Sequence, residues 1–135
     1  MNKALLDFEV TETGHQIIEA KINGRLLRFI LDTAAGASVL DRACLSDLGI
    51  EEKTNEECAQ GLGTSDHEMG RIDIPGIELD GTLYEEPSFV SLNLDHVQVA
   101  GGEKGVHGLL GYPFFSKYKA VIDFGVNKII LTIND

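Results

Sequence analysis

The sequence predicts a mainly β domain, folded as a closed or sandwich-like barrel with one or two short helices. Short apolar runs recur at close spacing, turn-forming residues separate them, and 15 of the 135 residues are glycine. Many short strands joined by turns are typical of barrels and sandwiches. The length suits a single domain, residues 1–135, with one hydrophobic core.

The first predicted strand covers residues 5–10, where apolar and polar side chains roughly alternate. We expect Leu5, Phe8 and Val10 to form its inward-facing set, with some slippage of the alternation.

A hairpin is predicted next. The dipeptide Asn23-Gly24 separates apolar runs at residues 16–22 and 25–31. Both residues accept positive φ, which a tight two-residue turn requires. A run of small residues follows, and residues 39–40 then predict a short buried strand.

Residues 41–48 predict a short helix. Asp41 can cap its first turn, an apolar stripe follows, and Gly49 suits the position just past its end. A second helix is expected at residues 113–117, because Pro113 fits the first turn.

The remaining segments predict strands, loops and turns. An exposed acidic stretch and a Gly-rich hairpin tip are expected at 51–60 and 61–67, and a polar loop at 95–106. The further strands are expected at 70–77, 82–94, 118–124 and 128–133.

Charge and composition exclude several classes of partner. The chain has 22 acidic and 11 basic residues, a formal net charge of −11. That sign argues against nucleic acids and anionic membranes, which attract clustered Lys and Arg. The longest apolar runs fall well short of the ~18 residues of a membrane span, and the first residues do not form a signal peptide. We therefore expect a cytoplasmic protein without a membrane association.

The two cysteines, Cys44 and Cys58, belong to no CxxC motif or Cys/His cluster. This pattern gives no support for a metal site, and we expect two reduced thiols and no cofactor.

The segment richest in chemical signals begins at Asp32. A buried apolar strand leads directly into this carboxylate, and Thr33 and a run of Ala and Gly follow. Small residues leave backbone N–H groups free to face a carboxylate, which suits a positioned catalytic acid. An aspartate at a strand end can also simply cap a turn, and the local pattern leaves both readings open.

Other catalytic motifs fail at this segment. A phosphoaspartate phosphatase needs a second Asp at position 34, which is Ala34, and a phosphate-binding loop needs a Lys after Gly36. A serine hydrolase elbow needs a second Gly two residues after Ser38, where Leu40 stands.

Residues 30–40 resemble the active-site strand and loop of retropepsin-like aspartic proteases, in which apolar residues precede Asp-Thr/Ser-Gly-Ala. The helix at 41–49 resembles the one that follows in bacterial members, and residues 106–115 resemble the second signature of the family, an apolar-Gly-apolar-Leu-Gly strand leading into a helix. Residues 118–131 resemble the closing hairpin, and the order and spacing match over about residues 15–133.

This resemblance implies a closed acid-protease barrel with one lobe per chain. It implies an aspartic endopeptidase in which two facing carboxylates share one proton. Asp32 is the one acid in such a setting, since Asp123 precedes a Phe-Gly turn and is expected to cap it. The second carboxylate then comes from Asp32 of a second copy, in a symmetric homodimer acting on a peptide or protein substrate.

The resemblance also assigns roles to neighbouring residues. Thr33 would donate its hydroxyl across the interface. Gly61, Leu62 and Gly63 lie where the family carries its substrate-covering flap, although an ordinary mobile hairpin would look the same. His107 is expected to be a surface residue, and Gly108 and Gly111 are expected to let a strand pass close beneath the active-site loop.

Ala34 departs from the family pattern, because the usual residue after Asp-Thr is Gly. If the site needs a backbone conformation at position 34 that only Gly adopts, Ala would cost about 1 kcal/mol or more. This cost favours an alternative interpretation as an inactive, peptide-binding dimer of the same fold. A third reading is an unrelated small-molecule-binding barrel. In an active dimer, the net negative charge should favour neutral or basic peptides.

Overall fold

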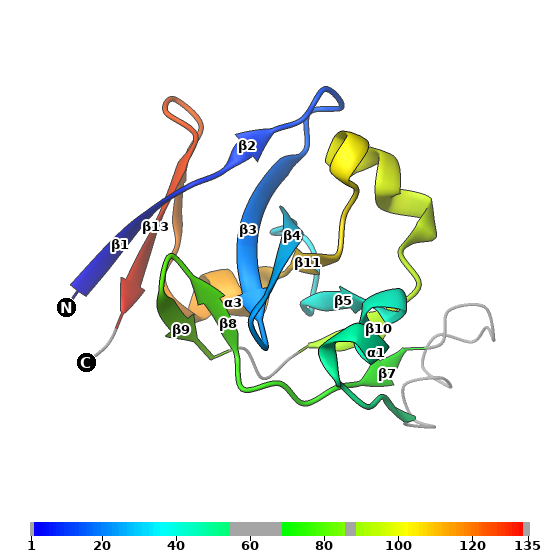
Figure 1. Ribbon diagram of the computed structural model, residues 1–135. Coiled ribbons are helices and arrows are strands. Elements are labelled where there is room, and N and C mark those ends of the chain that lie inside the picture. Colours follow the sequence, from blue (N-terminus) through cyan, green and yellow to red (C-terminus); the bar gives the residue numbers. More distant parts are fainter. Residues whose placement is uncertain (1, 55–68, 86–88, 134–135) are drawn as a thin grey trace.

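The computed structural model describes residues 2–54, 69–85 and 89–133 and contains two antiparallel or mixed sheets. One sheet has three strands in the order β1-β13-β12, and the other curls through the order β6-β7-β10-β5-β11-β4-β3-β8-β9. Figure 1 shows the three-stranded sheet beside the larger one. The predicted mainly β fold with a few short helices is confirmed.

The three-stranded sheet joins the two ends of the chain. Strand β1 (Asn2–Asp7) pairs antiparallel with β13 (Lys128–Ile133), which pairs with β12 (Val121–Asp123). The N- and C-terminal ends consequently lie side by side in Figure 1. Asp123 accepts the Gly125 N–H at 2.8 Å, so its predicted turn-capping role is confirmed.

The predicted inward set of the first strand was wrong for two of three residues. Phe8 is 6% exposed, but Leu5 and Val10 are 60% and 46% exposed, and Leu6 is buried instead. Successive side chains of a strand alternate between its faces, so Leu6 and Phe8 share the face toward the core and Leu5 takes the other. Leu5 lies in register with Ile130 on that outer face.

The predicted hairpin is confirmed at its predicted bounds. Strand β3 (Gln16–Ile22) pairs antiparallel with β4 (Arg25–Leu31), from Ile17 opposite Ile30 to Ile22 opposite Arg25. The turn residues Asn23 and Gly24 have φ values of 51° and 81°, as a two-residue hairpin turn of this kind requires.

Strand β11 (Gly108–Leu110) lies between two strands that precede it by far in the sequence. It runs parallel to β4 and antiparallel to β5 (Val39–Asp41). The chain between β4 and β5, residues 32–38, therefore passes over the C-terminal end of β11. Gly108 is required here, because a Cβ at this residue would lie 2.4 Å from the Val39 carbonyl oxygen.

The other strands are shorter than the sequence predicts. The predicted strand at 70–77 divides into two, since residues 72–76 are irregular. The strand predicted at 82–94 is also interrupted, since residues 85 and 89 are not in a strand. The remaining strands are β2 (Glu9–Val10), β6 (Lys53–Thr54), β7 (Gly70–Arg71), β8 (Ile77–Leu79), β9 (Thr82–Tyr84) and β10 (Val90–Leu92).

The helix predicted at 41–48 forms as a 3-10 turn, η1 (Arg42–Cys44), that continues into α1 (Leu45–Leu48). The Asp41 carboxylate accepts the Ala43 N–H at 3.2 Å, and Gly49 ends the helix with φ 69°. The predicted second helix is α3 (Tyr112–Lys117), with Pro at its start. No helix in the described part of the chain is long and apolar enough to cross a lipid bilayer.

The polar loop predicted at 95–106 is instead mostly helical. Residues Asp95–Lys104 form η3, two 3-10 turns that join at Gly102, where φ is 70°. The Gln98 side chain closes this segment, because its amide nitrogen donates to the Val106 carbonyl and its oxygen accepts the Val106 N–H. Closure by a polar side chain leaves no periodic apolar signal in the sequence.

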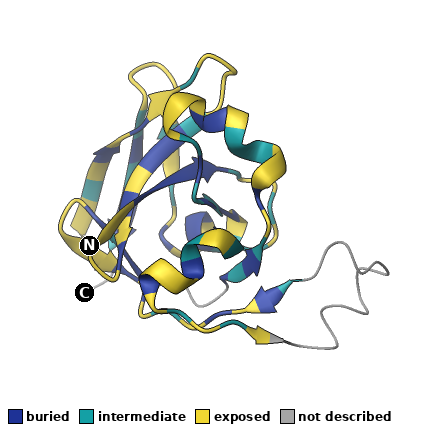
Figure 2. Cartoon of the chain, turned by 45° about the vertical axis from the view of Figure 1, so that its right-hand side comes forward, coloured by how far each residue is buried: buried dark blue, intermediate teal, exposed yellow. Residues whose placement is uncertain are grey.

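The main core lies where both sheets and α3 meet. The ring of Tyr84 on β9 packs edge-to-face against Phe114 and Tyr118, with centroids 6.1 Å and 5.1 Å apart. Figure 2 shows buried positions along the strands and exposed ones at the hairpin turns and along much of η3. A smaller, separate apolar cluster lies beneath η3 and consists of Ile17, Ile30, Ala100 and Val106, with Leu109 packed against it.

The two faces of β1 give a direct test of which side chains face the core. We expect Leu6→Ala to lower the free energy of unfolding by about 2–4 kcal/mol, because it leaves a cavity in the core. Leu5→Ala should change it by no more than about 0.5 kcal/mol. Urea unfolding of both variants measures the difference. Equal losses of unfolding free energy would contradict the assignment of Leu6 to the core face and Leu5 to the outer face.

Candidate active site

Asp32 follows β4 directly, and the neighbouring strand fixes its backbone. Its N–H donates to the Leu110 carbonyl at 2.9 Å, which extends the pairing of β4 with β11 by one residue. The side chain is partly exposed, and its carboxylate makes no hydrogen bond to another described residue. Asp32 is thus rigidly placed by its backbone while its carboxylate stays open to a substrate or to water.

The loop after Asp32 is held from below by the end of β11 and the start of α3. Tyr112 N–H donates to the Ala35 carbonyl at 2.8 Å, and Gly111 N–H donates to the buried Ser38 hydroxyl at 3.0 Å. A Cβ at Gly111 would lie 2.5 Å from the Ala37 carbonyl oxygen. The prediction that these glycines allow close passage beneath the loop is therefore confirmed.

Thr33 and Ala34 form the tip of this loop, and both are exposed. The Ala35 N–H donates back to the Asp32 carbonyl at 3.1 Å, so the two residues occupy the centre of a β-turn. Neither has positive φ. The backbone of this chain therefore does not require Gly at position 34, and the strain that the sequence raised as a concern is not present here.

A pocket of about 370 Å³ opens beside Asp32. Its floor comes from β4 and β11, and η3 forms a wall. Most of its lining is aliphatic, but two histidines join Asp32 as polar members. The lining residues are His15, Ile30, Leu31, Asp32, His96, Val97, Val99, Ala100 and Leu109.

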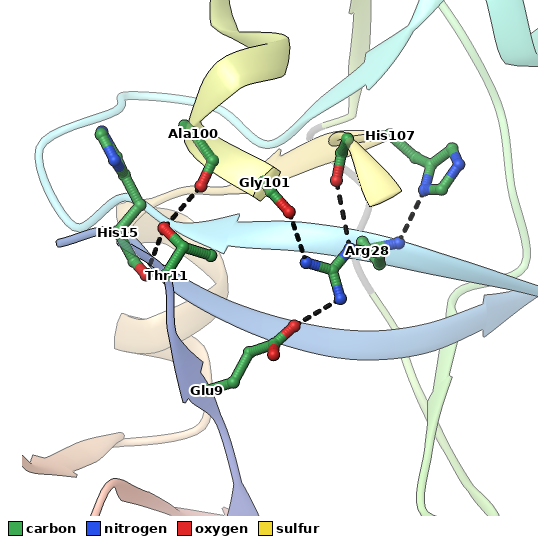
Figure 3. Close-up of polar contacts among 8 residues, drawn as sticks. Glu9, Thr11, His15, Arg28, Ala100, Gly101 and His107 are labelled. Atoms are coloured by element: carbon green, nitrogen blue, oxygen red, sulfur yellow. Dashed lines mark hydrogen bonds and ion pairs between the residues drawn. The ribbon is translucent and has the colours of Figure 1, made fainter. Parts of the chain in front are cut away.

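Sequence reasoning missed a polar cluster behind this pocket, which Figure 3 shows. Arg28 on β4 is only 7% exposed. Its guanidinium forms an ion pair with Glu9, and it donates to the carbonyls of Gly101 at 2.8 Å and Gly105 at 3.1 Å. The basic residue at 28 was the available signal, but its partners lie up to 77 residues away in the sequence.

His107 belongs to the same cluster, so the expectation of a surface residue was wrong. It is partly buried, and its ring Nδ1 accepts the backbone N–H of Arg28 at 2.9 Å, while the backbone N–H of His107 donates to the Arg28 carbonyl. The Nδ1 atom can accept only in the neutral ring with the proton on Nε2. Burial, with a contribution from the Arg28 charge, lowers the pKa of His107 from its ordinary value, although Asp41 opposes this.

A cysteine nucleophile is not supported at Cys44. Burial, and then the charges of Asp41 and Asp47, raise the pKa of this thiol to about 11. It is therefore protonated at neutral pH and far from a reactive thiolate. Cys58 and the predicted flap residues Gly61, Leu62 and Gly63 lie outside the described residues.

The lowered pKa of His107 predicts that the stability of the protein depends on pH. Its pKa is lower in the folded protein than in the unfolded chain, so acid favours the unfolded state. The contribution of the neutral His107 ring to the free energy of unfolding is complete above about pH 6.5. It is lost as the pH falls toward the pKa of His107 in the folded protein.

We expect His107→Gln, which keeps an acceptor but does not titrate, to lose less stability than the wild type between about pH 7 and pH 5. Urea unfolding at both pH values checks this, and the carboxylates common to both proteins cancel in the comparison. Equal losses would show that His107 does not titrate differently on folding.

Comparison with known proteins identifies the family of this chain. The sequence profile of the family described as aspartyl protease matches residues 18–114, from β3 to α3. DNA damage-inducible protein 1 of Chaetomium globosum is 28% identical over 127 residues, which cover 91% of this chain and 26% of that protein. The chain thus spans about a quarter of the length of this curated relative.

Solved structures share the fold at low identity. A retropepsin-like aspartic protease from Rickettsia conorii matches with a TM-score of 0.63 and 18% identity, covering 96% of this chain and 88% of that chain. The retroviral protease-like domain of Ddi1 from Leishmania major matches with a TM-score of 0.62 and 15% identity, covering 85% and 86%. The profile match covers more than half of the sequence, so the chain belongs to the aspartyl protease family and has a retropepsin-like fold.

Proposed function

We propose that the protein is an aspartic endopeptidase that hydrolyses peptide bonds through a pair of Asp32 carboxylates, one from each of two copies. The observation that supports this most is the placement of Asp32. Its backbone is fixed by β11, its carboxylate is open, and an aliphatic pocket adjoins it. A peptide bound at this pocket would place a side chain in it and its backbone near the carboxylate.

The chemistry needs two carboxylates. Like charges in contact cannot both ionise, so one carboxyl keeps its proton while the other is ionised. The ionised member takes a proton from water, which attacks the carbonyl carbon, and the protonated member donates to the carbonyl oxygen. Among the residues that the structure describes, Asp32 is the one carboxylate that lines the pocket.

Two other aspartates at strand ends, Asp41 and Asp123, already have structural tasks. Asp41 is 6% exposed and accepts the N–H groups of Ala43 and Leu94, and Asp123 caps its own turn. The second carboxylate is therefore sought in a second copy of the chain. The exposed tip at Thr33 and Ala34 offers a surface on which two copies can meet about a two-fold axis, with the Thr33 hydroxyl donating to the partner's loop.

The alternative of an inactive peptide-binding dimer rested on Ala34. Because Ala34 has no positive φ, its backbone gives no reason for inactivity. The remaining argument for inactivity is the space that the Ala34 methyl group needs between two loops at the dimer axis. We therefore favour the enzyme.

Asp32→Asn tests the mechanism directly. We expect this nearly isosteric change to abolish cleavage of a mixed peptide library between about pH 4 and 6, because an amide cannot share or accept the proton. Asp123→Asn, at an exposed turn, is the matched control and should keep activity within about twofold. Full activity of Asp32→Asn would remove Asp32 from the mechanism.

A subunit-mixing experiment tests the homodimer in the same assay. Adding excess Asp32→Asn protein to the wild type, with time for subunit exchange, should suppress activity because mixed dimers hold one competent carboxylate. Unchanged activity, together with a strict monomer in sedimentation at micromolar concentration, would contradict a shared site.

Ala34→Gly tests the departure from the family pattern. We expect peptidase activity to be retained or raised, since the variant removes a methyl group where two loops would meet. The free energy of unfolding should fall by about 0.4–1 kcal/mol, because glycine adds freedom to the unfolded chain. Peptidase assay and urea unfolding measure the two effects, and complete loss of activity would show that the methyl group is needed.

A further inference from the structure

The wall of the pocket beside Asp32 is anchored from behind by Arg28. Val97, Val99 and Ala100 of η3 form this wall. Gly101, the next residue along the chain, gives its carbonyl to the Arg28 guanidinium at 2.8 Å, and Gly105 gives its carbonyl at 3.1 Å. One side chain thus holds the segment that carries the wall at two points, as Figure 3 shows for Gly101.

The anchored segment is closed internally by the Gln98 side chain, but its path bends at two glycines. Gly102 and Gly105 have φ values of 70° and 68°, so its path bends twice in the left-handed region. Glycine allows these angles but also many others, and external contacts must select one path. The Thr11 hydroxyl adds a further contact, donating to the Ala100 carbonyl at 2.7 Å.

The guanidinium itself is fixed in orientation. Glu9 pairs with it from β2, and the planar fork of Arg presents its remaining N–H groups to the two glycine carbonyls. Burying a charge in this way contributes little to stability compared with an apolar residue. A buried, fully directed guanidinium is therefore better explained by the geometry that it imposes.

The backbone of Arg28 connects this anchor to the candidate catalytic strand. Arg28 lies four residues before Asp32 on the same segment, and its N–H and carbonyl both bond to His107, which immediately precedes β11. The position of Asp32 depends on β4 and β11, and the position of the wall depends on the Arg28 side chain. Arg28 thus contributes to the position of both parts, and so to the separation between the Asp32 carboxylate and the wall.

We propose that Arg28 is a positioning residue for substrate binding, which holds the η3 wall at the separation from Asp32 that a large aliphatic side chain needs. This inference rests on the proposed peptidase function, which already implies an apolar subsite beside the scissile bond, and it adds the residue that keeps the wall of that subsite in place. The aliphatic choice follows from Ile30 and Leu109 on the floor and Val97 and Val99 on the wall.

The test compares two peptides that differ only in having leucine or alanine at the residue before the scissile bond. In Arg28→Met, which keeps the apolar stem and removes every donor, we expect KM for the leucine peptide to rise about tenfold. For the alanine peptide, KM should change by no more than about twofold, and kcat for both by less than about threefold. For the leucine peptide, the KM of Arg28→Lys should fall between those of the wild type and Arg28→Met, since a single ammonium group replaces the forked guanidinium.

Matched controls separate positioning from general damage. Arg25→Met removes an exposed arginine from the same strand and should leave both KM values unchanged. Amide hydrogen exchange of residues 95–107 should be faster in Arg28→Met than in the wild type and unchanged in Arg25→Met. If Arg28→Met does not fold, Arg28→Lys and Glu9→Gln provide the same comparison with smaller changes.

The outcomes distinguish the inference from the function on which it rests. An active Arg28 variant with an unchanged leucine-to-alanine preference overturns the positioning role alone, and so does a uniform loss of kcat for both peptides. A wild-type protein with no activity on either peptide overturns the proposed function, and the positioning role with it.

Discussion

The insertion of β11 between β4 and β5 is the constraint on which the candidate active site depends. It obliges the chain to carry residues 32–38 over the end of a buried strand, so Asp32 lies at a place that packing below fixes and solvent above can reach. Gly108 in β11 and Gly111 just after it are part of the same constraint. Cβ atoms at these two residues would collide with the carbonyls of Val39 and Ala37. A rigid backbone beneath an open carboxylate is what general acid–base chemistry requires of its scaffold.

The features that the sequence predicted are those with local causes. Asn23-Gly24 formed its hairpin turn and Asp41 capped its helix, because the relevant contacts lie within a few residues of each other. The overall fold followed from several such motifs at family spacing. In contrast, the inward face of the first strand was wrong at Leu5, where neither face of the strand is marked by polarity alone.

Long-range polar partnerships escaped prediction for a physical reason. A lone arginine or histidine in a sequence carries no mark of its partner, and Arg28 and His107 meet across 79 positions. The helical turns of η3 escaped for the same reason, since Gln98 and Arg28 hold them in place of an apolar stripe. The position of Asp32 could be predicted from its motif, whereas the wall that completes the pocket could not.

The placement of β11 also has a consequence for how the molecule folds. The β3–β4 hairpin can form from neighbouring residues within microseconds, but β11 must close a long loop before it can enter its slot. Loop closure costs entropy before the contacts are gained, so we expect this step to limit the folding rate. During synthesis, the loop that presents Asp32 therefore stays without its support until the chain has been made past Tyr112, and the site can be completed only then.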